Sequence, residues 1–268
     1  MVVHQLPILL YHSVSDVAAP SYRPFAVSPA RFAEHLSVLS RRHFAPLTVA
    51  QAVESRLPGR SLPPQPIVIS FDDGLEDFLT GAMPVLEHYG FPATLFVATG
   101  YVGKTAKWLG NLGEGDRPML DWNQLSGLSA RGIELGAHTR THLQLDVISL
   151  KQAWAEIVGS KVDLETALAI EVKSFAYPHG YSTPAVRKIV SDAGFTAACR
   201  VRHAVSTTNE NPFALSRIVV TEEMGEEALL AAVEGESVPV APPTDALPAA
   251  GWRLVRQIDK RLRAGVGN

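Results

Sequence analysis

Ile67-Val-Ile-Ser-Phe-Asp-Asp-Gly74 joins the pattern of a buried strand to a pair of carboxylates. Its first five residues are apolar apart from one serine and rich in β-branched side chains, which is typical of a strand covered on both faces. The following Asp-Gly is also a common turn signal. However, two adjacent carboxylates at the end of an apolar strand repel each other and lose hydration. Asp72 and Asp73 are therefore candidates for a reaction centre, with a solvated turn as the alternative.

Strand patterns recur on both sides of this stretch. Further strands are expected at residues 7–12, 93–98, 133–137, 172–176, 196–201 and 215–220. Helical patterns lie between them: one begins after the N-cap Ser28, and others cover 48–55, 83–89, 123–131, 150–169 and 184–193. This alternation predicts an α/β fold built on a parallel sheet or barrel. The polar clusters each follow a strand, which is where parallel barrels form their sites.

Composition sets broad limits on function. Of the 268 residues, 46% are hydrophobic and 19% are charged, and the net charge of −3 provides no basic field for nucleic acid. The single cysteine, Cys199, has no partner for an intrachain disulfide and is expected to be a small buried hydrophobe. The sequence shows neither a secretory signal nor an apolar run of about 18 residues. We therefore expect a soluble, cytoplasmic protein.

The C-terminal part differs from the rest in composition. We expect one catalytic unit over residues 1–235, a Pro/Ala-rich linker over 236–250 and a basic amphipathic helix over 251–268. This helix would carry Trp252 and Ile258 on one side and several arginines elsewhere. It either docks on the catalytic unit or makes weak contact with an anionic membrane surface.

His138-Thr-Arg-Thr-His142 places two imidazoles four residues apart, so that one turn of chain presents both to a cation. Asp73 is the natural third ligand because it also follows a buried strand. Two histidines and one carboxylate leave a position on zinc open for water, which is the catalytic pattern. Asp72 would then lie beside that water as a general base. The alternative is a pair of hydrogen-bonded loop histidines.

Four segments together resemble the polysaccharide deacetylase family, the NodB-homology domain of carbohydrate esterase family 4. Ser70-Phe-Asp-Asp-Gly74 is similar to the first motif and His138-Thr-Arg-Thr-His142 to the second; Phe175-Ala-Tyr-Pro-His-Gly180 is similar to the third, and Leu120-Asp-Trp122 loosely to the fourth. The order and spacing agree over residues 6–220. The start, Leu10-Tyr-His-Ser-Val14, resembles the subgroup that deacetylates poly-N-acetylglucosamine.

The resemblance implies a distorted (β/α)7 barrel with Asp72 as base. It implies a divalent metal held by Asp73, His138 and His142, with zinc expected and Co²⁺, Ni²⁺ or Fe²⁺ as alternatives. The backbone N–H at His179, where an aromatic residue is common, would help to hold the oxyanion. His12 would lie near the metal.

Two positions depart from the family's pattern. Ala176 stands where many members carry an arginine that orients the base, and Arg217 stands where a histidine acid is expected. The resemblance therefore assigns no general acid, and we hypothesise that His12 protonates the leaving amine or holds the substrate. Trp108, Tyr101 and Trp122 are candidates for stacking on sugar rings, with packing as the alternative. His4, His35, His43 and His88 are expected to be surface or packing residues, and His203 lies in a polar stretch.

These observations favour a hydrolase that removes N-acetyl groups from an amino sugar or glycan and releases acetate. Three alternatives stay open: cleavage of another C–N amide, cleavage of an O-acetyl ester as on xylan, and a glycan-binding homologue without catalysis. Binding would not require Asp72, so its presence favours an enzyme. The sequence leaves the oligomeric state and the identity of the glycan open.

Overall fold

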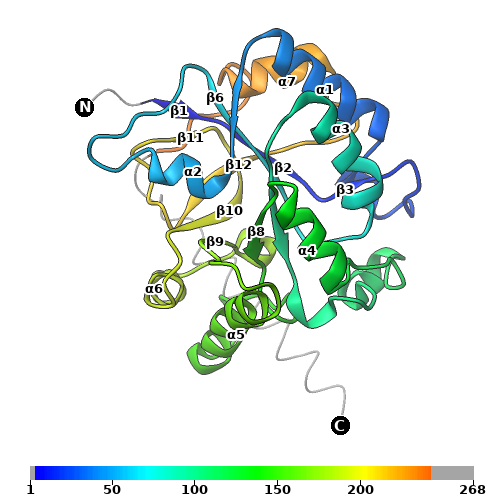
Figure 1. Ribbon diagram of the computed structural model, residues 1–268, viewed down its shortest axis with the longest axis vertical. Helices are drawn as coiled ribbons and strands as arrows, with labels where there is room; N and C mark the ends of the chain where they lie inside the picture. Colours follow the sequence, from blue (N-terminus) through cyan, green and yellow to red (C-terminus); the bar gives the residue numbers. More distant parts are fainter. Residues whose placement is uncertain (1–3, 243–268) are drawn as a thin grey trace.

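A computed structural model describes residues 4–242. Seven parallel strands form a closed barrel in the order β2-β12-β10-β9-β8-β7-β6, and pairing of β6 with β2 closes the ring (Figure 1). These strands are β2 (Ile8–Tyr11), β6 (Pro66–Phe71), β7 (Thr94–Val97), β8 (Glu134–Ala137), β9 (Ser174–Ala176), β10 (Ala197–His203) and β12 (Leu215–Val219). The expected parallel α/β barrel of seven strands is confirmed.

The joints of the ring differ in extent. The β2–β6 ladder pairs four positions, from Ile8 with Val68 to Tyr11 with Phe71. The β8–β9 ladder pairs one position, Ala137 with Phe175. An eighth strand, β5 (Ala45–Leu47), adds to the first half of β6 outside the ring.

Helices surround the barrel (Figure 1). They are α1 (Pro29–Arg41), α2 (Val49–Glu54), α3 (Met83–Tyr89), α4 (Trp122–Ala130), α5 (Leu150–Leu168), α6 (Pro184–Asp192) and α7 (Glu226–Val233). Ser28, Thr48 and Ser149 each accept a hydrogen bond from the N3 backbone N–H of the helix that follows, which satisfies one of its unpaired first-turn donors. The predicted N-cap at Ser28 is therefore correct.

Short elements precede or connect the barrel strands and helices. They are the strands β1 (Gln5–Leu6), β3 (Ser13–Val14), β4 (Ala26–Val27) and β11 (Ser206–Thr207), the 3₁₀ turns η1 (Arg23–Phe25), η3 (Thr99–Tyr101), η4 (Lys107–Leu112) and η5 (Pro178–Gly180), and the π-helical turn η2 (Phe78–Ala82) before α3.

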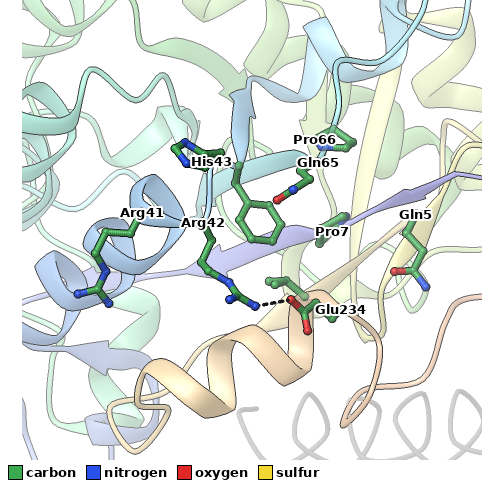
Figure 2. A pocket seen from close by; sticks show the side chains of 10 residues that line it. Gln5, Pro7, Arg41, Arg42, His43, Gln65, Pro66 and Glu234 are labelled. Carbon is green, nitrogen blue, oxygen red and sulfur yellow. Dashed lines mark ion pairs between the residues drawn. The ribbon is translucent and has the colours of Figure 1, made fainter.

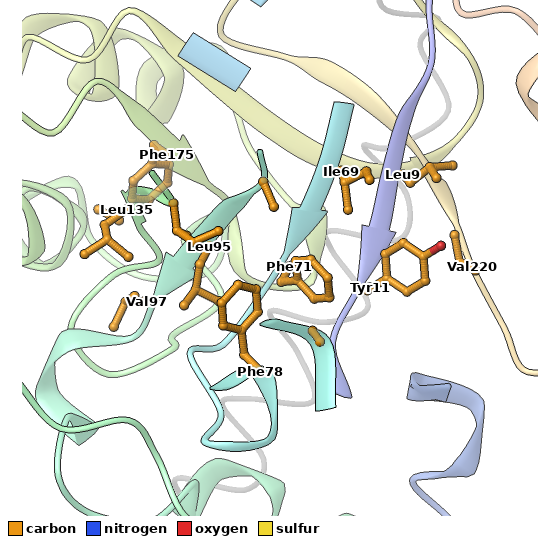
Figure 3. Close-up of a cluster of buried hydrophobic side chains, with 14 of the residues drawn as sticks. Leu9, Tyr11, Ile69, Phe71, Phe78, Leu95, Val97, Leu135, Phe175 and Val220 are labelled. Atoms are coloured by element: carbon orange, nitrogen blue, oxygen red, sulfur yellow. The ribbon is translucent and has the colours of Figure 1, made fainter. Parts of the chain in front are cut away.

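The strands bury side chains on both faces with a period of two. Outward-facing residues such as Leu9, Ile69, Leu95 and Phe175 join the helices in the main core (Figure 3). The residues that alternate with them, Ile8, Val68, Phe96, Ala176 and Cys199, form a second cluster that fills the barrel interior. Cys199 is fully buried, as expected.

Besides the short strands, β5 and α7 were not anticipated from the sequence. Strand β5 has only three residues, and α7 follows the last barrel strand and covers α1. Within the expected linker, Pro239 and Ala241 exchange backbone hydrogen bonds with Val205 at 2.9 and 2.8 Å. The rest of that linker and the expected helix over 251–268 lie outside the described residues. Among residues 4–242, no helix has the length and hydropathy needed to span a bilayer.

Candidate metal and catalytic site

The expected site residues follow the carboxyl ends of four barrel strands, β2, β6, β8 and β9. His12 follows β2, Asp72 and Asp73 follow β6, and His138 follows β8, while His179 lies in η5 just after β9. Parallel strands direct all of these ends to one mouth of the barrel. Residues separated by more than 160 positions in sequence are thereby gathered in one place.

The chain turns sharply at Asp73 so that both carboxylates face the mouth. Asp73 has φ 81° and Gly74 has φ 85°, both in the left-handed region. A Cβ at Gly74 would lie 3.2 Å from Val97, so this turn requires glycine. The carbonyl of Asp73 accepts the N–H of Ala98 at 3.1 Å, which ties the turn to the next strand. A left-handed non-glycine residue costs about 1–3 kcal/mol and is typical of functional sites.

The second motif forms a loop that helix α5 holds in place. Thr139 and His142 both adopt left-handed conformations, with φ 64° and 56°. The carboxylate of Glu156 accepts two of the three backbone N–H groups between the two histidines, from Arg140 at 2.9 Å and from Thr141 at 2.8 Å. Its other oxygen accepts the Thr141 hydroxyl at 2.7 Å. One helical carboxylate thus fixes the spacing of His138 and His142.

Asp73, His138 and His142 bring one ligand atom each within 4.8 Å of one another. Asp73 Oδ1 lies 3.3 Å from His142 Nε2 and 3.6 Å from His138 Nε2. Two ligands on a tetrahedral zinc ion are about 3.3–3.5 Å apart when the bonds are about 2.0–2.2 Å. Asp73 Oδ1 is also buried without a hydrogen-bond partner. A small cation among these three atoms would satisfy that oxygen, so the residues fit the expected metal.

Hydrogen bonding fixes the tautomer of His138. Its Nδ1 lies 2.8 Å from the carbonyl oxygen of Ala176, which can only accept, so Nδ1 carries the proton. Nε2 therefore presents its lone pair toward Asp73. Burial lowers the pKa of His138 to about 4, although Asp72 and Asp73 oppose the shift. The imidazole is neutral at pH 7, as a metal ligand must be.

Asp72 is held by an arginine from β12, a strand that β2 separates from β6 in the ring. Arg217 Nη1 and Nη2 donate to the two carboxylate oxygens at 2.6 and 2.7 Å. Arg217 lies in β12, is fully buried, and also donates to the Arg200 carbonyl at 3.0 Å. The arginine that the sequence lacks at Ala176 is thus supplied by another strand. The expected histidine position is occupied by a group that orients Asp72 and has no proton to give at neutral pH.

Arg217 also controls the charge of Asp72. Burial alone would raise the pKa of this carboxyl, but the guanidinium of Arg217 and the nearby His138 hold it below its usual range. Asp72 therefore stays ionised in a site where it is 2% exposed. Asp73 behaves similarly: burial raises its pKa, and His142, His12 and His138 lower it well below the usual range.

His12 and His179 lie beside this centre. The imidazole of His12 helps to lower the pKa of both aspartates and meets the ring of Phe25 edge-on at 5.4 Å. The His179 ring lies 4.9 Å from that of His142, and the residue has φ 57°. Both predicted neighbours of the metal triad are thus brought to the mouth.

Other histidines and aromatic residues have structural contacts. His35 is buried between the Tyr11 hydroxyl and the Met224 carbonyl, and His203 Nδ1 accepts the Val219 N–H. Trp108 stacks on His142 at 4.9 Å and packs on Tyr101 at 4.7 Å. Sequence reasoning did not anticipate this support for His142.

A large cavity lies elsewhere. Its volume is about 580 Å³, and its walls include Pro7 and Pro66, which stand at the amino-terminal ends of barrel strands (Figure 2). It is therefore at the opposite end of the barrel from Asp72. Two of its charged groups neutralise each other, since Arg42 pairs with Glu234 at 3.5 Å. The reactive side chains described above do not line it.

Known proteins resemble this chain in sequence and fold. A family model described as polysaccharide deacetylase matches residues 59–198, just over half of the chain. YxkH of Bacillus subtilis (strain 168) is 26% identical over 86% of this chain and 76% of its own length. The poly-beta-1,6-N-acetyl-D-glucosamine N-deacetylase of Staphylococcus aureus (strain MRSA252) is 24% identical over 76% of this chain and 71% of its own. The structure of Streptococcus pyogenes deacetylase PplD in complex with acetate has a TM-score of 0.75 at 22% identity, over 87% of this chain and 99% of that one, which shows a shared fold.

Proposed function

We propose, from the premise that this chain belongs to the polysaccharide deacetylase family, that it removes N-acetyl groups from amino sugars of a glycan and releases acetate. One observation carries the proposal: an ionised Asp72 stands next to a set of three ligand atoms suited to a divalent cation. The Staphylococcus aureus relative, by its name, acts on poly-β-1,6-N-acetylglucosamine, so this polymer is the first substrate to test.

Asp73, His138 and His142 would hold the cation. A divalent ion such as zinc, when bound there, supplies a Lewis acid that polarises an amide carbonyl and acidifies water. Ala176 orients one of the proposed ligands, because its carbonyl accepts the Nδ1 proton of His138 and so fixes the tautomer. Glu156 supports it from the side by holding the loop between the histidines.

Asp72 acts as general base. It takes a proton from the attacking water, whose oxygen bonds to the acetyl carbon. Arg217 keeps the carboxylate ionised and fixes its orientation by two hydrogen bonds. The C–N bond then breaks, its electron pair stays on nitrogen, and the nitrogen takes up a proton as acetate departs.

The remaining two residues serve the oxyanion and the leaving group. We assign to the backbone N–H of His179 the role of a donor that stabilises the charge developing on the former carbonyl oxygen. His12, on the opposite strand β2, delivers a proton to the departing amine or holds the sugar that carries it. Arg217 cannot fill the acid role, because its guanidinium stays protonated at any accessible pH.

Acetate release tests the proposal directly. The purified chain is stripped with a chelator, reloaded with Zn²⁺, Co²⁺ or Ni²⁺, and supplied with N-acetylglucosamine oligomers and with acetylated xylan. We expect acetate and free amine in equal amounts from the amino sugars and recovery of activity on reloading. Full activity after exhaustive chelation would exclude the metal-assisted route, and acetate from xylan alone would favour the O-acetyl esterase.

A further inference from the structure

Two aromatic rings at the barrel mouth are both accessible to solvent and in contact with site histidines. Phe25, at the end of η1, is 37% exposed and meets His12 edge-on at 5.4 Å. Tyr181 follows η5, is also 37% exposed, and stacks on His179 at 6.3 Å with an interplanar angle of 23°. Phe25 also packs on Tyr22 at 5.5 Å, so both rings are held in place while part of each residue stays accessible. Aromatic rings that are partly accessible beside a polar reaction centre suit the C–H faces of sugar rings.

The strand order puts these rings on different sides of the mouth. Phe25 lies beside the end of β2, and Tyr181 lies beyond the end of β9. Going round the ring, β12 and β10 separate these two strands in one direction, and β6, β7 and β8 separate them in the other. Asp73 and His138 end β6 and β8, so the metal triad lies between the two rings.

The other aromatic residues near the mouth are less suited to bind sugar. Trp108 already stacks on His142, and Tyr101 packs on Trp108. Trp122 begins helix α4 and packs against the main core. Of the three stacking candidates predicted from sequence, none has a ring placed as Phe25 and Tyr181 are, beside the two flanking histidines.

We propose that Phe25 and Tyr181 form two sugar-stacking subsites, one on each side of the unit that loses its acetyl group. The substrate is then an internal unit of a chain of at least three sugars, not a single amino sugar. This inference rests on the proposed function and adds the substrate's length and the residues that select it. Each ring binds the apolar face of a neighbouring pyranose, while the acetamide of the central unit reaches the metal triad.

A ladder of substrates tests the length requirement. The zinc-loaded chain is assayed on β-1,6-linked N-acetylglucosamine oligomers of one to five units, and the position of each free amine is read by mass spectrometry. We expect kcat/KM to rise until the chain has three units or more, and the first amine to appear on an internal unit. Equal kcat/KM for one and five units, or a first amine only at a chain end, would overturn the proposal.

Variants test the residues themselves. Phe25→Ala and Tyr181→Ala should each raise KM for the pentamer by roughly 3- to 10-fold, the range expected for the loss of one aromatic stacking contact. The rise in kcat/KM from monomer to pentamer should shrink accordingly. Phe25→Tyr and Tyr181→Phe keep a flat ring and should preserve that rise. A wild-type length profile in both alanine variants would exclude the subsites.

Matched controls separate this inference from the function on which it rests. Trp154 has a ring that is 46% exposed on α5, and Trp154→Ala should leave both the pentamer and the monomer constants at wild-type values. Zinc content and the near-ultraviolet circular dichroism of each variant show whether it has folded. If no substrate releases acetate, the proposed function fails. If acetate is released without any dependence on length or on the two rings, only the subsites fail.

Discussion

Two arginine–aspartate pairs stand near the barrel mouth, one fully and one partly buried, and the pKa values of their carboxyls shift in opposite directions although each arginine lowers the pKa of its partner. Arg217 contacts Asp72 inside the barrel, and Arg117 contacts Asp77 at the rim; each pair has an N–O distance of 2.6 Å. Burial raises the pKa of Asp77, and its hydrogen bonds do not reverse the shift. The pKa of Asp72 is lowered despite complete burial. Contact distance alone therefore does not determine the charge of a buried carboxyl.

The surroundings of the two carboxyls differ: His138 and His12 also lower the pKa of Asp72, and the two arginines distribute their donors differently. Arg217 directs two of its N–H groups to Asp72 and meets no second carboxylate in the described contacts. Arg117 divides its donors among Asp77, Glu114, the Ser13 hydroxyl and the Val17 carbonyl. The first arrangement stabilises one negative charge, which suits a base. The second links three separate chain segments, which suits a structural tie.

Neutralising each aspartate should give the largest contrast between the pairs. Asp72→Asn keeps one acceptor oxygen for Arg217 but removes the base, so we expect turnover to fall by a factor of ~10² or more with zinc still bound. Asp77→Asn should lower turnover less than tenfold and act mainly on thermal stability. Acetate release and zinc content measure both. Similar losses of turnover in the two variants would contradict the assignment of Asp72 as base and of Asp77 as a structural residue.

Asp73→Asn completes that comparison, because Asp73 contributes to the proposed metal set and Asp72 does not. We expect this variant to lose zinc affinity as well as turnover. Zinc content measured after dialysis against a weak chelator gives the answer. If Asp72→Asn and Asp73→Asn lost zinc equally, the assignment of base and ligand would be incorrect.

Glu156 should affect the affinity for zinc although it is not one of the proposed metal ligands. Second-layer partners of metal ligands typically change affinity by about 10- to 100-fold. We expect Glu156→Ala to weaken zinc binding within that range, because Arg140 and Thr141 lose their common acceptor. Competition with a chromophoric chelator measures it. Glu165→Gln, on the same helix but bonded to Lys161, is the control and should leave zinc affinity unchanged.

Replacing each arginine by lysine should give smaller effects that still distinguish the two arginine–aspartate pairs. Arg217→Lys keeps the charge but loses the paired hydrogen bonds, so the pKa of Asp72 should rise and kcat/KM should fall roughly tenfold. Since only ionised Asp72 is active, the acidic limb of the pH–rate profile should move to higher pH. Arg117→Lys should lower the melting temperature and leave that limb in place. An unmoved limb in Arg217→Lys would show that Arg217 does not tune the base.

The smallest expected effect is a difference in how pH changes stability. The pKa of Asp72 is lower in the folded chain, so the unfolded chain binds more protons between the two values and stability is lost as pH falls through that window. For Asp77, whose folded pKa is raised, the folded chain binds more protons and stability is lost as pH rises above 3.8. Urea unfolding of the metal-free chain between pH 3 and 7 gives the free energy of unfolding at each pH. The contribution that falls with decreasing pH should be lost in Asp72→Asn, and the contribution that falls with increasing pH should be lost in Asp77→Asn.

Local sequence patterns identified the centre of the site but not its supports. Asp72 and Asp73 follow a continuous apolar strand, and His138 and His142 have a spacing that one loop can bring to one ion; both signals are local. The Arg217–Asp72 pair joins residues 145 positions apart across the barrel interior. A charged side chain within the apolar strand pattern of residues 215–220 was the available signal, because such a group requires a buried partner.

Loops account for the rest of what the sequence did not predict. The positions of Phe25 and Trp108 depend on 3₁₀ turns that lack a clear periodic pattern. Helix α7 has no side-chain cap, so only Gly225 and the acidic Glu226 and Glu227 mark its start. These elements are set by contacts with a barrel that exists only after folding.

The single-position ladder between β8 and β9 makes this ring mechanically uneven. Ala137 pairs with Phe175 there, and the His138–Ala176 hydrogen bond crosses the same joint beside it. An ion bound by His138 would fix the imidazole whose Nδ1 donates to Ala176, and would thereby stabilise the joint with the shortest ladder. Loading the metal should slow amide hydrogen exchange along β8 and β9 more than along the four-position joint of β2 and β6. The cation would then stabilise the barrel in addition to its proposed role in catalysis.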